Sequence, residues 1–221
     1  KEFFEDLEGF DVEIQEWDDT VLDHFVSSSL KWSLNVSAGF EELDIAEEIL
    51  AEIDPDTDTE YATYIWNAYS ASDTVQGNIV YINYGRRSDY EDIIANENYT
   101  QIPDASYFEG KIGLVRYGNG GRSTKVKVAQ DYGMIGLLMF SDPNQYAPEP
   151  ELVYPNGAWL PPTGVQRGSI KYSSCPGNPT SERLDTLCGI TDMDEALPTI
   201  PVMPLSYKNA ETIFSVMEGD A

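Results

Sequence analysis

Hydrophobic positions in the middle of the chain follow the pattern of a βαβ unit. Residues 111–117, KIGLVRY, form a continuous apolar run typical of a buried strand, and residues 134–140, MIGLLMF, form a second one. Between them, GNGGR indicates a glycine loop, and STKVKVAQDYG predicts a short helix with Ser123 or Thr124 at its N-cap and Gly133 at its end. Two buried strands joined by a crossover helix predict a parallel sheet and an α/β fold.

Other segments alternate between apolar and polar residues or repeat at helical spacing. Residues 30–36, LKWSLNV, predict a strand with Asn35 on its outer face, whereas residues 40–53, FEELDIAEEILAEI, predict a helix. The segment NIVYINYGRR predicts a strand that ends at Gly85 and brings Arg86 and Arg87 to the sheet edge.

The C-terminal region predicts one more strand and one more helix. TIPVMPL is typical of an extended strand interrupted by prolines, and Ser206 is a suitable N-cap for the helix that follows. The apolar residues of this helix fall on one stripe, which we expect to face the core: Ala210, Ile213, Phe214 and Met217.

Residues 154–169, YPNGAWLPPTGVQRGS, contain three prolines and three glycines, so they fit neither a helix nor a central strand. Long loops of this kind in compact domains are usually functional or disordered. Because Tyr154, Trp159, Leu160 and Val165 supply apolar surface that can pack, we expect an ordered, functional loop.

The charge of the chain excludes one class of partner. Thirty-nine acidic and 13 basic residues give a net charge of -26, which repels nucleic acids and anionic membrane surfaces. No apolar run reaches the roughly 18 residues of a membrane span, so we expect no nucleic-acid partner and no direct membrane contact. The acidity favours a solvated surface, with a calcium site as the alternative.

Two cysteines and two sequons favour the secretory pathway. Cys175 and Cys188 lie in a segment rich in Pro, Ser and Thr, where a disulfide would stabilise the fold by about 3 kcal/mol; two unrelated thiols are the alternative. Asn35-Val36-Ser37 and Asn98-Tyr99-Thr100 have the form of N-glycosylation sites. We therefore expect an extracellular, cell-surface or lumenal location.

Candidate catalytic groups are few. His24 is the only histidine, and neither a zinc ligand set nor a G-x-S-x-G nucleophile motif is present. The chain by itself is therefore predicted to have no catalytic residues and no cofactor. Because it begins at Lys1, we expect it to be a piece of a longer protein.

Four motifs in order resemble the protease-associated (PA) apical domain of the glutamate carboxypeptidase II and transferrin receptor family. They are KVKVAQDYGMIGLLMFSDP at 125–143, YPNG at 154–157, GVQRGS at 164–169 and IPVMPLSYKNAETI at 200–213. The resemblance implies a β-sandwich core with the βαβ unit and flanking helices. It places the PA domain at 66–221, with 1–65 contributing N-terminal strands and a helix to the same apical unit.

The resemblance also assigns functional positions. In the family's peptidases this domain covers a di-zinc hydrolase domain, with the Pro- and Gly-rich loop at the cavity rim. Arg86 matches the position of an arginine that contacts an acidic substrate, with a surface salt bridge as the alternative role. Where the carboxypeptidase loop has Trp-Asn, with the Asn contacting the substrate, this chain has Ala158 and Trp159, so the polar contact that gives glutamate specificity is missing. Where the family has a segment that contributes to a calcium site, this chain has Gly177-Asn178-Pro179-Thr180, so Thr180 is the candidate calcium ligand.

The resulting hypothesis is a PA domain that gates and recognises substrate for a secretory-pathway zinc peptidase of the glutamate carboxypeptidase type. Zinc would be held by the missing peptidase domain. The partners would be that domain and the dimerisation domain of the same parent, in a homodimer. The alternative is a non-catalytic receptor-like or cargo-binding PA domain that mediates protein interaction.

Overall fold

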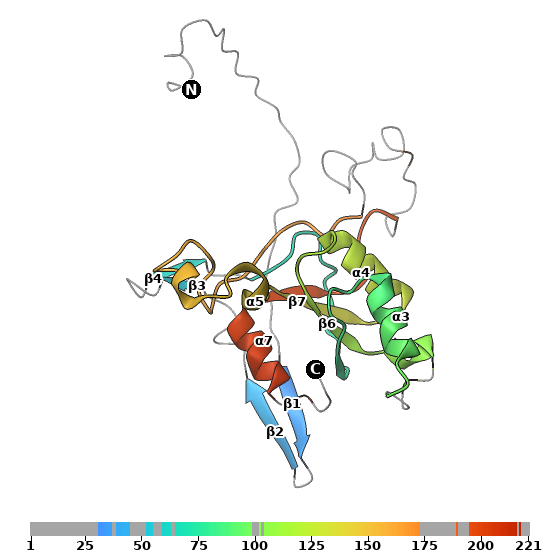
Figure 1. Cartoon of the computed structure of the whole chain (residues 1–221). Helices are drawn as coiled ribbons and strands as arrows, with labels where there is room; N and C mark the ends of the chain where they lie inside the picture. Colours follow the sequence, from blue (N-terminus) through green and yellow to red (C-terminus); the bar gives the residue numbers. More distant parts are fainter. Residues whose placement is uncertain are drawn as a thin grey trace, which may run out of the picture.

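The computed structural model describes residues 65–98, 102, 104–172, 189, 195–215 and 217, together with four strands between 31 and 62. The core is a parallel sheet in the order β5-β6-β7-β8, formed by β5 (Ile79–Tyr81), β6 (Ile112–Arg116), β7 (Gly136–Phe140) and β8 (Val202–Leu205) (Figure 1). The predicted βαβ unit and α/β class are confirmed, because β6 and β7 pair in parallel and are connected in the chain by α4 (Arg122–Asp131).

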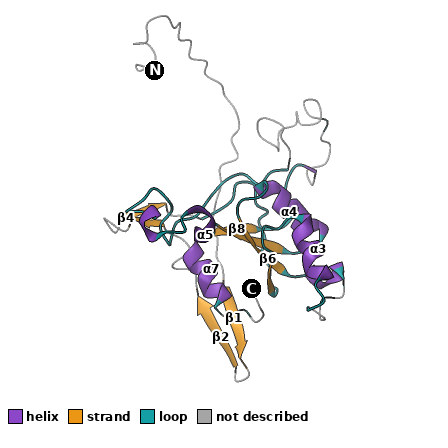
Figure 2. Cartoon of the chain, viewed as in Figure 1, coloured by secondary structure: helices purple, strands orange, loops and turns teal. Residues whose placement is uncertain are grey.

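Helices cover both faces of this sheet (Figure 2). On one face lie α3 (Arg87–Ala95) and α4, and on the other lies α7 (Tyr207–Phe214). Side chains of β7 alternate between the two apolar clusters: Leu137 and Met139 pack on the α3 and α4 side, whereas Leu138 and Phe140 pack with α7. Burial on both faces explains why β7 is apolar throughout.

The helix ends agree with the sequence in two of three cases. Ser206 caps α7 as predicted, since its Oγ accepts the Asn209 N–H at 3.2 Å. Gly133, with φ at 73°, follows the last residues of α4, also as predicted. The predicted cap at Ser123 or Thr124 is wrong, because α4 already begins at Arg122 and Gly121 is its N-cap, without a side-chain hydrogen bond.

Two antiparallel hairpins precede the sheet. In the first, β1 (Lys31–Val36) pairs with β2 (Gly39–Asp44), and in the second, β3 (Glu52–Asp54) pairs with β4 (Thr59–Ala62). The predicted strand at 30–36 is therefore confirmed. The helix predicted at 40–53 is wrong at 40–44 and 52–53, because pairing with a neighbouring strand overrides the helix preference of Glu, Leu and Ala.

The remaining described elements are short. They are η1 (Ala105–Phe108), α5 (Pro143–Tyr146) and η2 (Pro150–Leu152). The loop that follows is ordered, as predicted: Val153 and Trp159 form an isolated bridge, and Val165 is buried between the sheet and α7. Its Tyr154–Pro155 peptide bond is cis.

Candidate functional site

Arg86 stands at the carboxyl end of β5, where the chain turns into α3. The Gly85 N–H donates to the Ile82 carbonyl at 2.6 Å, and Gly85 has φ at 64°, a left-handed conformation that suits glycine. Arg86 is then the N-cap of α3. The structure therefore brings this residue to the sheet edge, where the sequence pattern placed it.

Asp89 holds Arg86 through three hydrogen bonds. The Arg86 backbone N–H donates to Oδ2 at 2.8 Å, Nε donates to the same oxygen at 3.1 Å, and Nη2 donates to Oδ1 at 2.8 Å. The Asp89 side chain is 3% exposed, whereas that of Arg86 is 46% exposed. One side of the guanidinium is thus fixed, while the group remains accessible from solvent.

The same contacts keep Asp89 ionised. Burial acts to raise the pKa of Asp89, but hydrogen bonds from Arg86 and the nearby Lys125 charge outweigh it, so the pKa lies below its usual value. The cation and the carboxylate are therefore both charged at neutral pH.

The ring of Tyr84 lies among three cations. The Arg116 Cζ is 4.3 Å from the ring centroid, the Arg86 Cζ is 5.4 Å away, and the Lys125 Nζ is 5.5 Å away. Arg116 is also paired with Asp142, with Nη1 2.7 Å from Oδ2. Positive charge is thus gathered at this edge around a polarisable ring.

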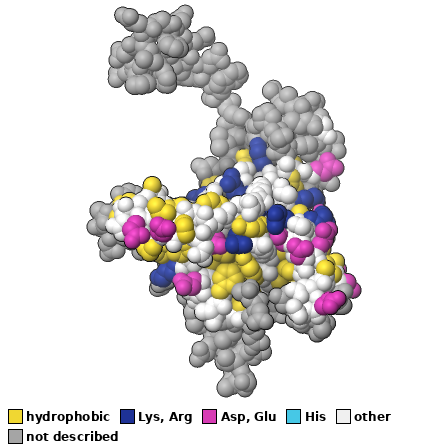
Figure 3. Space-filling model, viewed as in Figure 1, with side chains coloured by type: hydrophobic (Ala, Val, Ile, Leu, Met, Phe, Trp, Pro, Cys, Tyr) yellow, Lys and Arg dark blue, Asp and Glu magenta, His cyan; other side chains and the backbone are white. Residues whose placement is uncertain are grey.

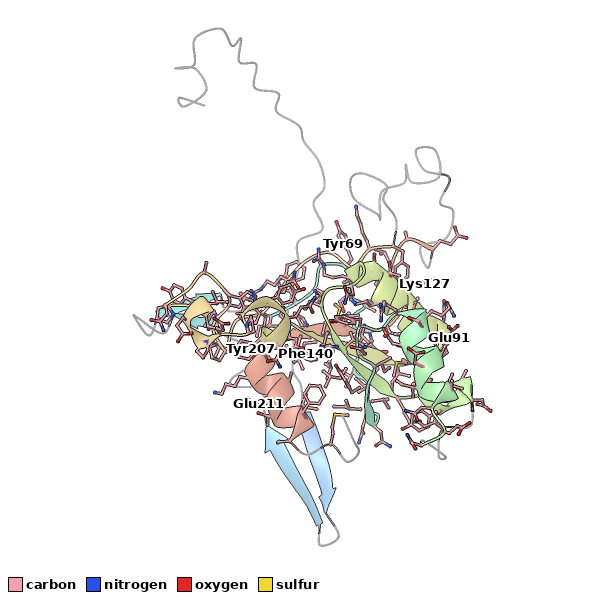
Figure 4. The ribbon with its side chains drawn as sticks, in the orientation of Figure 1. Tyr69, Glu91, Lys127, Phe140, Tyr207 and Glu211 are labelled. Carbon is pink, nitrogen blue, oxygen red and sulfur yellow. The ribbon has the colours of Figure 1, made fainter. Side chains whose placement is uncertain are left out.

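Tyr84 also connects Arg86 to the Pro- and Gly-rich loop. Its hydroxyl donates to the Gln145 Oε1 at 3.3 Å, and the next residue, Tyr146, stacks on Trp159 with ring centroids 6.1 Å apart. Trp159 stacks in turn on Tyr207 at 5.3 Å. In Figure 4, Tyr207 is labelled at the start of α7. We call the surface from Arg86 to Trp159 the carboxyl edge.

The sequence reasoning found Arg86 and Trp159 but missed the residues that join them. Asp89 stands three residues after the helix N-cap, which is the spacing of a capping box, so this signal was available. Tyr84, Lys125 and Gln145 carry no such local signal, because their partners lie far away in the chain.

Charge is distributed unevenly between the described and the remaining residues. Ten of the 13 basic residues have described side chains, compared with only 13 of the 39 acidic ones. Figure 3 shows Lys and Arg side chains over the described part, interspersed with acidic ones. The described residues therefore carry far less net negative charge than the whole chain.

Several predicted positions lie outside the described residues: His24, Cys175, Thr180 and Cys188. Asn98 is exposed in a turn after α3, whereas only the backbone of Asn35 is described, in β1. Within the described ranges, no three His, Cys, Asp or Glu side chains gather as a metal ion would require, and no helix is long and apolar enough to cross a membrane. These residues thus hold no candidate zinc centre.

Comparison with known proteins identifies the family. The family model of the PA domain matches residues 56–172, which include β5, β6, β7 and the whole Pro- and Gly-rich loop. The chain belongs to the PA domain family. The match contains both Arg86 and Trp159, so the carboxyl edge is part of the PA domain.

Three relatives share most of this PA domain chain. A glutamate carboxypeptidase 2 homolog of Caenorhabditis briggsae is 36% identical over 73% of this chain and 21% of its own length. Aminopeptidase NAALADL1 of Rattus norvegicus is 31% identical over 69% and 20%, and vacuolar protein sorting-associated protein 70 of Saccharomyces cerevisiae is 29% identical over 70% and 19%. The chain thus spans about a fifth of the length of these relatives.

Proposed function

We propose that this chain is the PA domain of a larger zinc peptidase of the glutamate carboxypeptidase type, and that it recognises and gates substrate without being catalytic alone. Two of the relatives have names that describe peptidases, and the chain corresponds to about a fifth of each. The apical unit would comprise residues 1–65 together with the PA domain at 66–221. The remaining peptidase and dimerisation domains would be its partners in a homodimer.

The observation that carries this proposal is the half-exposed guanidinium of Arg86, which is held in place by its salt bridge with the buried Asp89 carboxylate. A braced guanidinium presents its remaining donors in a fixed direction, which suits a carboxylate of an acidic peptide. Through Tyr84 and Gln145, this group shares one edge with Trp159, whose ring would contact the apolar part of the same substrate.

Metal chemistry would come from the rest of the parent. Two zinc ions in a peptidase domain would polarise the scissile carbonyl and activate water. The described residues of this chain would bind and orient the substrate and exclude water from the cavity. The proposed location is the cell surface or the lumen of the secretory or vacuolar pathway.

The test compares Arg86→Ala with Arg87→Ala in the complete protein. Arg87 is the matched control, because it is the adjacent residue, is also exposed and pairs with Asp131 at 2.5 Å. We expect Arg86→Ala to lower kcat/KM about tenfold or more for a peptide ending in glutamate, but to change little for the same peptide ending in glutamine. Equal effects on both peptides, or equal effects of both variants, would reject the role of Arg86.

A second function, a binding PA domain without catalysis, is favoured by the relative named for vacuolar protein sorting. Plasma emission spectrometry of the complete protein separates the two. About two zinc ions per chain would support the peptidase. Absence of zinc would instead support a receptor-like or cargo-binding protein, and partner pull-downs would follow.

A further inference from the structure

Lys125 is a buried lysine in the first half of α4. It is 1% exposed, and the charges of Asp89, Arg86 and Arg116 lie near enough to affect its ionisation. Lysine is almost never fully buried unless its ammonium is paired. The helix also carries an exposed lysine, Lys127, seen on its outer side in Figure 4.

The ammonium of Lys125 joins two turns at the carboxyl edge. Nζ donates to the Tyr84 carbonyl at 2.5 Å and to the Gly118 carbonyl at 2.7 Å. Tyr84 belongs to the turn after β5 and Gly118 to the glycine loop after β6. One side chain therefore ties together the two chain segments that leave neighbouring strands.

Arg86 follows directly from one of these turns. Only Gly85 separates Tyr84 from Arg86 in the chain, and a Cβ added at Gly85 would lie 2.9 Å from the Val115 Cγ1. A shift of the Tyr84 carbonyl would therefore move the start of α3 and the guanidinium with it. The Tyr84 ring, which lies near both cations, would move as well.

We propose that Lys125 is the positioning residue for Arg86: by tying the Tyr84 and Gly118 carbonyls together, it sets where the Arg86 guanidinium stands at the carboxyl edge. This inference rests on the proposed function of Arg86 in binding an acidic peptide. Lys125 itself is buried and does not touch the ligand.

The charged groups around Lys125 make this role dependent on pH. Burial lowers the pKa of Lys125 to about 8. The negative charge of Asp89 on α3 acts to raise this pKa, whereas the positive charges of Arg86, before α3, and Arg116, at the end of β6, lower it further. Above this pKa the neutral amine donates weaker hydrogen bonds to the two carbonyls. A bound carboxylate would favour the protonated form, so binding should weaken as the pH rises through 8.

The experiment measures binding of two fluorescent pentapeptides, ending in Glu-Glu or Gln-Gln, to the complete protein by fluorescence anisotropy, with EDTA present to stop hydrolysis. The readout is the ratio of the two affinities, since a general loss of folded protein lowers both equally. We expect Lys125→Met to reduce the preference for Glu-Glu about tenfold, and Lys127→Met on the same helix to leave it unchanged.

The outcomes separate this inference from the proposed function. If Arg86→Ala leaves the preference intact, the proposed function fails and this inference fails with it. If Arg86→Ala abolishes the preference but folded Lys125→Met retains it, only the positioning role is wrong. If Lys125→Met does not fold, the same affinity ratio is measured for the wild-type protein as a function of pH. A preference for Glu-Glu that stays constant between pH 7 and pH 9.5 overturns the role of Lys125, and a preference that falls across pH 8 supports it.

Discussion

The Asp89 carboxylate accepts hydrogen bonds from both the backbone and the guanidinium of Arg86: Oδ2 lies 2.8 Å from the backbone nitrogen, and Oδ1 lies 2.8 Å from Nη2. The same carboxylate therefore caps α3 and orients the side chain proposed to bind substrate. Stability and recognition are coupled at this residue, which makes it the first place to test.

Replacing Asp89 with alanine should lower the free energy of unfolding by about 2 kcal/mol, because a helix cap and charged hydrogen bonds are lost together. Asp92→Ala on the exposed side of the same helix is the control and should change it by less than about 0.5 kcal/mol. Urea unfolding measures both. Similar values for the two variants would mean that the buried contacts contribute little.

Stability should also depend on the ionisation of Lys125. Its pKa is about 8 in the folded state, below the ordinary 10.5, so between these values the unfolded chain binds more protons than the folded one. Stability from this residue therefore rises with pH across that window, by on the order of 2 kcal/mol. In urea unfolding, the free energy of unfolding of Lys125→Met should rise less than that of the wild type between pH 8 and pH 10.5. Parallel pH curves for the two proteins would contradict this.

Trp159 should stabilise the loop through its two stacked neighbours. Trp159→Ala removes both ring contacts and should cost about 2 kcal/mol, whereas Tyr146→Ala removes only the outer one and should cost about 1 kcal/mol. The double variant measures the coupling between the two rings. Strictly additive effects would show that this stacking does not contribute to stability.

Two glycines with similar backbone angles separate conformational strain from steric conflict. Gly85 has φ at 64° and Gly110 has φ at 69°, but an added Cβ meets Val115 at 2.9 Å only at Gly85 and has nothing within 4 Å at Gly110. We expect Gly110→Ala to cost about 1 kcal/mol and Gly85→Ala to cost at least twice as much. Thermal unfolding of both variants, compared at one pH, tests the difference.

The sequon at Asn98 gives a test of the proposed location. Asn98 is exposed in the turn after α3, so its side chain is accessible to glycosylation during passage through the secretory pathway. Protein secreted from a eukaryotic host should lose mass on treatment with peptide N-glycosidase. The Asn98→Gln variant should lose less mass than the wild type on the same treatment. An equal loss of mass would show that the glycan is attached to another residue.

Much of the fold could be predicted because it depends on local patterns. The apolar runs that became β6 and β7, the intervening helix and the Ser206 cap all involve residues within a few positions of each other. The helix predicted at 40–53 failed where the outcome depended on a partner strand, as the pairing of Trp32 with Leu43 shows. Short segments with mixed propensity take the structure that tertiary contacts favour.

The sequence by itself determined the α/β class, the resemblance to PA domains and the placement of Arg86 after a strand, because each depends on spacing along the chain. Only the tertiary structure decided what surrounds Arg86. Lys125 lies 41 residues from the carbonyl it binds at Tyr84, and Tyr84 lies 61 residues from Gln145. These contacts arise because parallel strands bring their carboxyl ends to one edge, a proximity that no local pattern encodes.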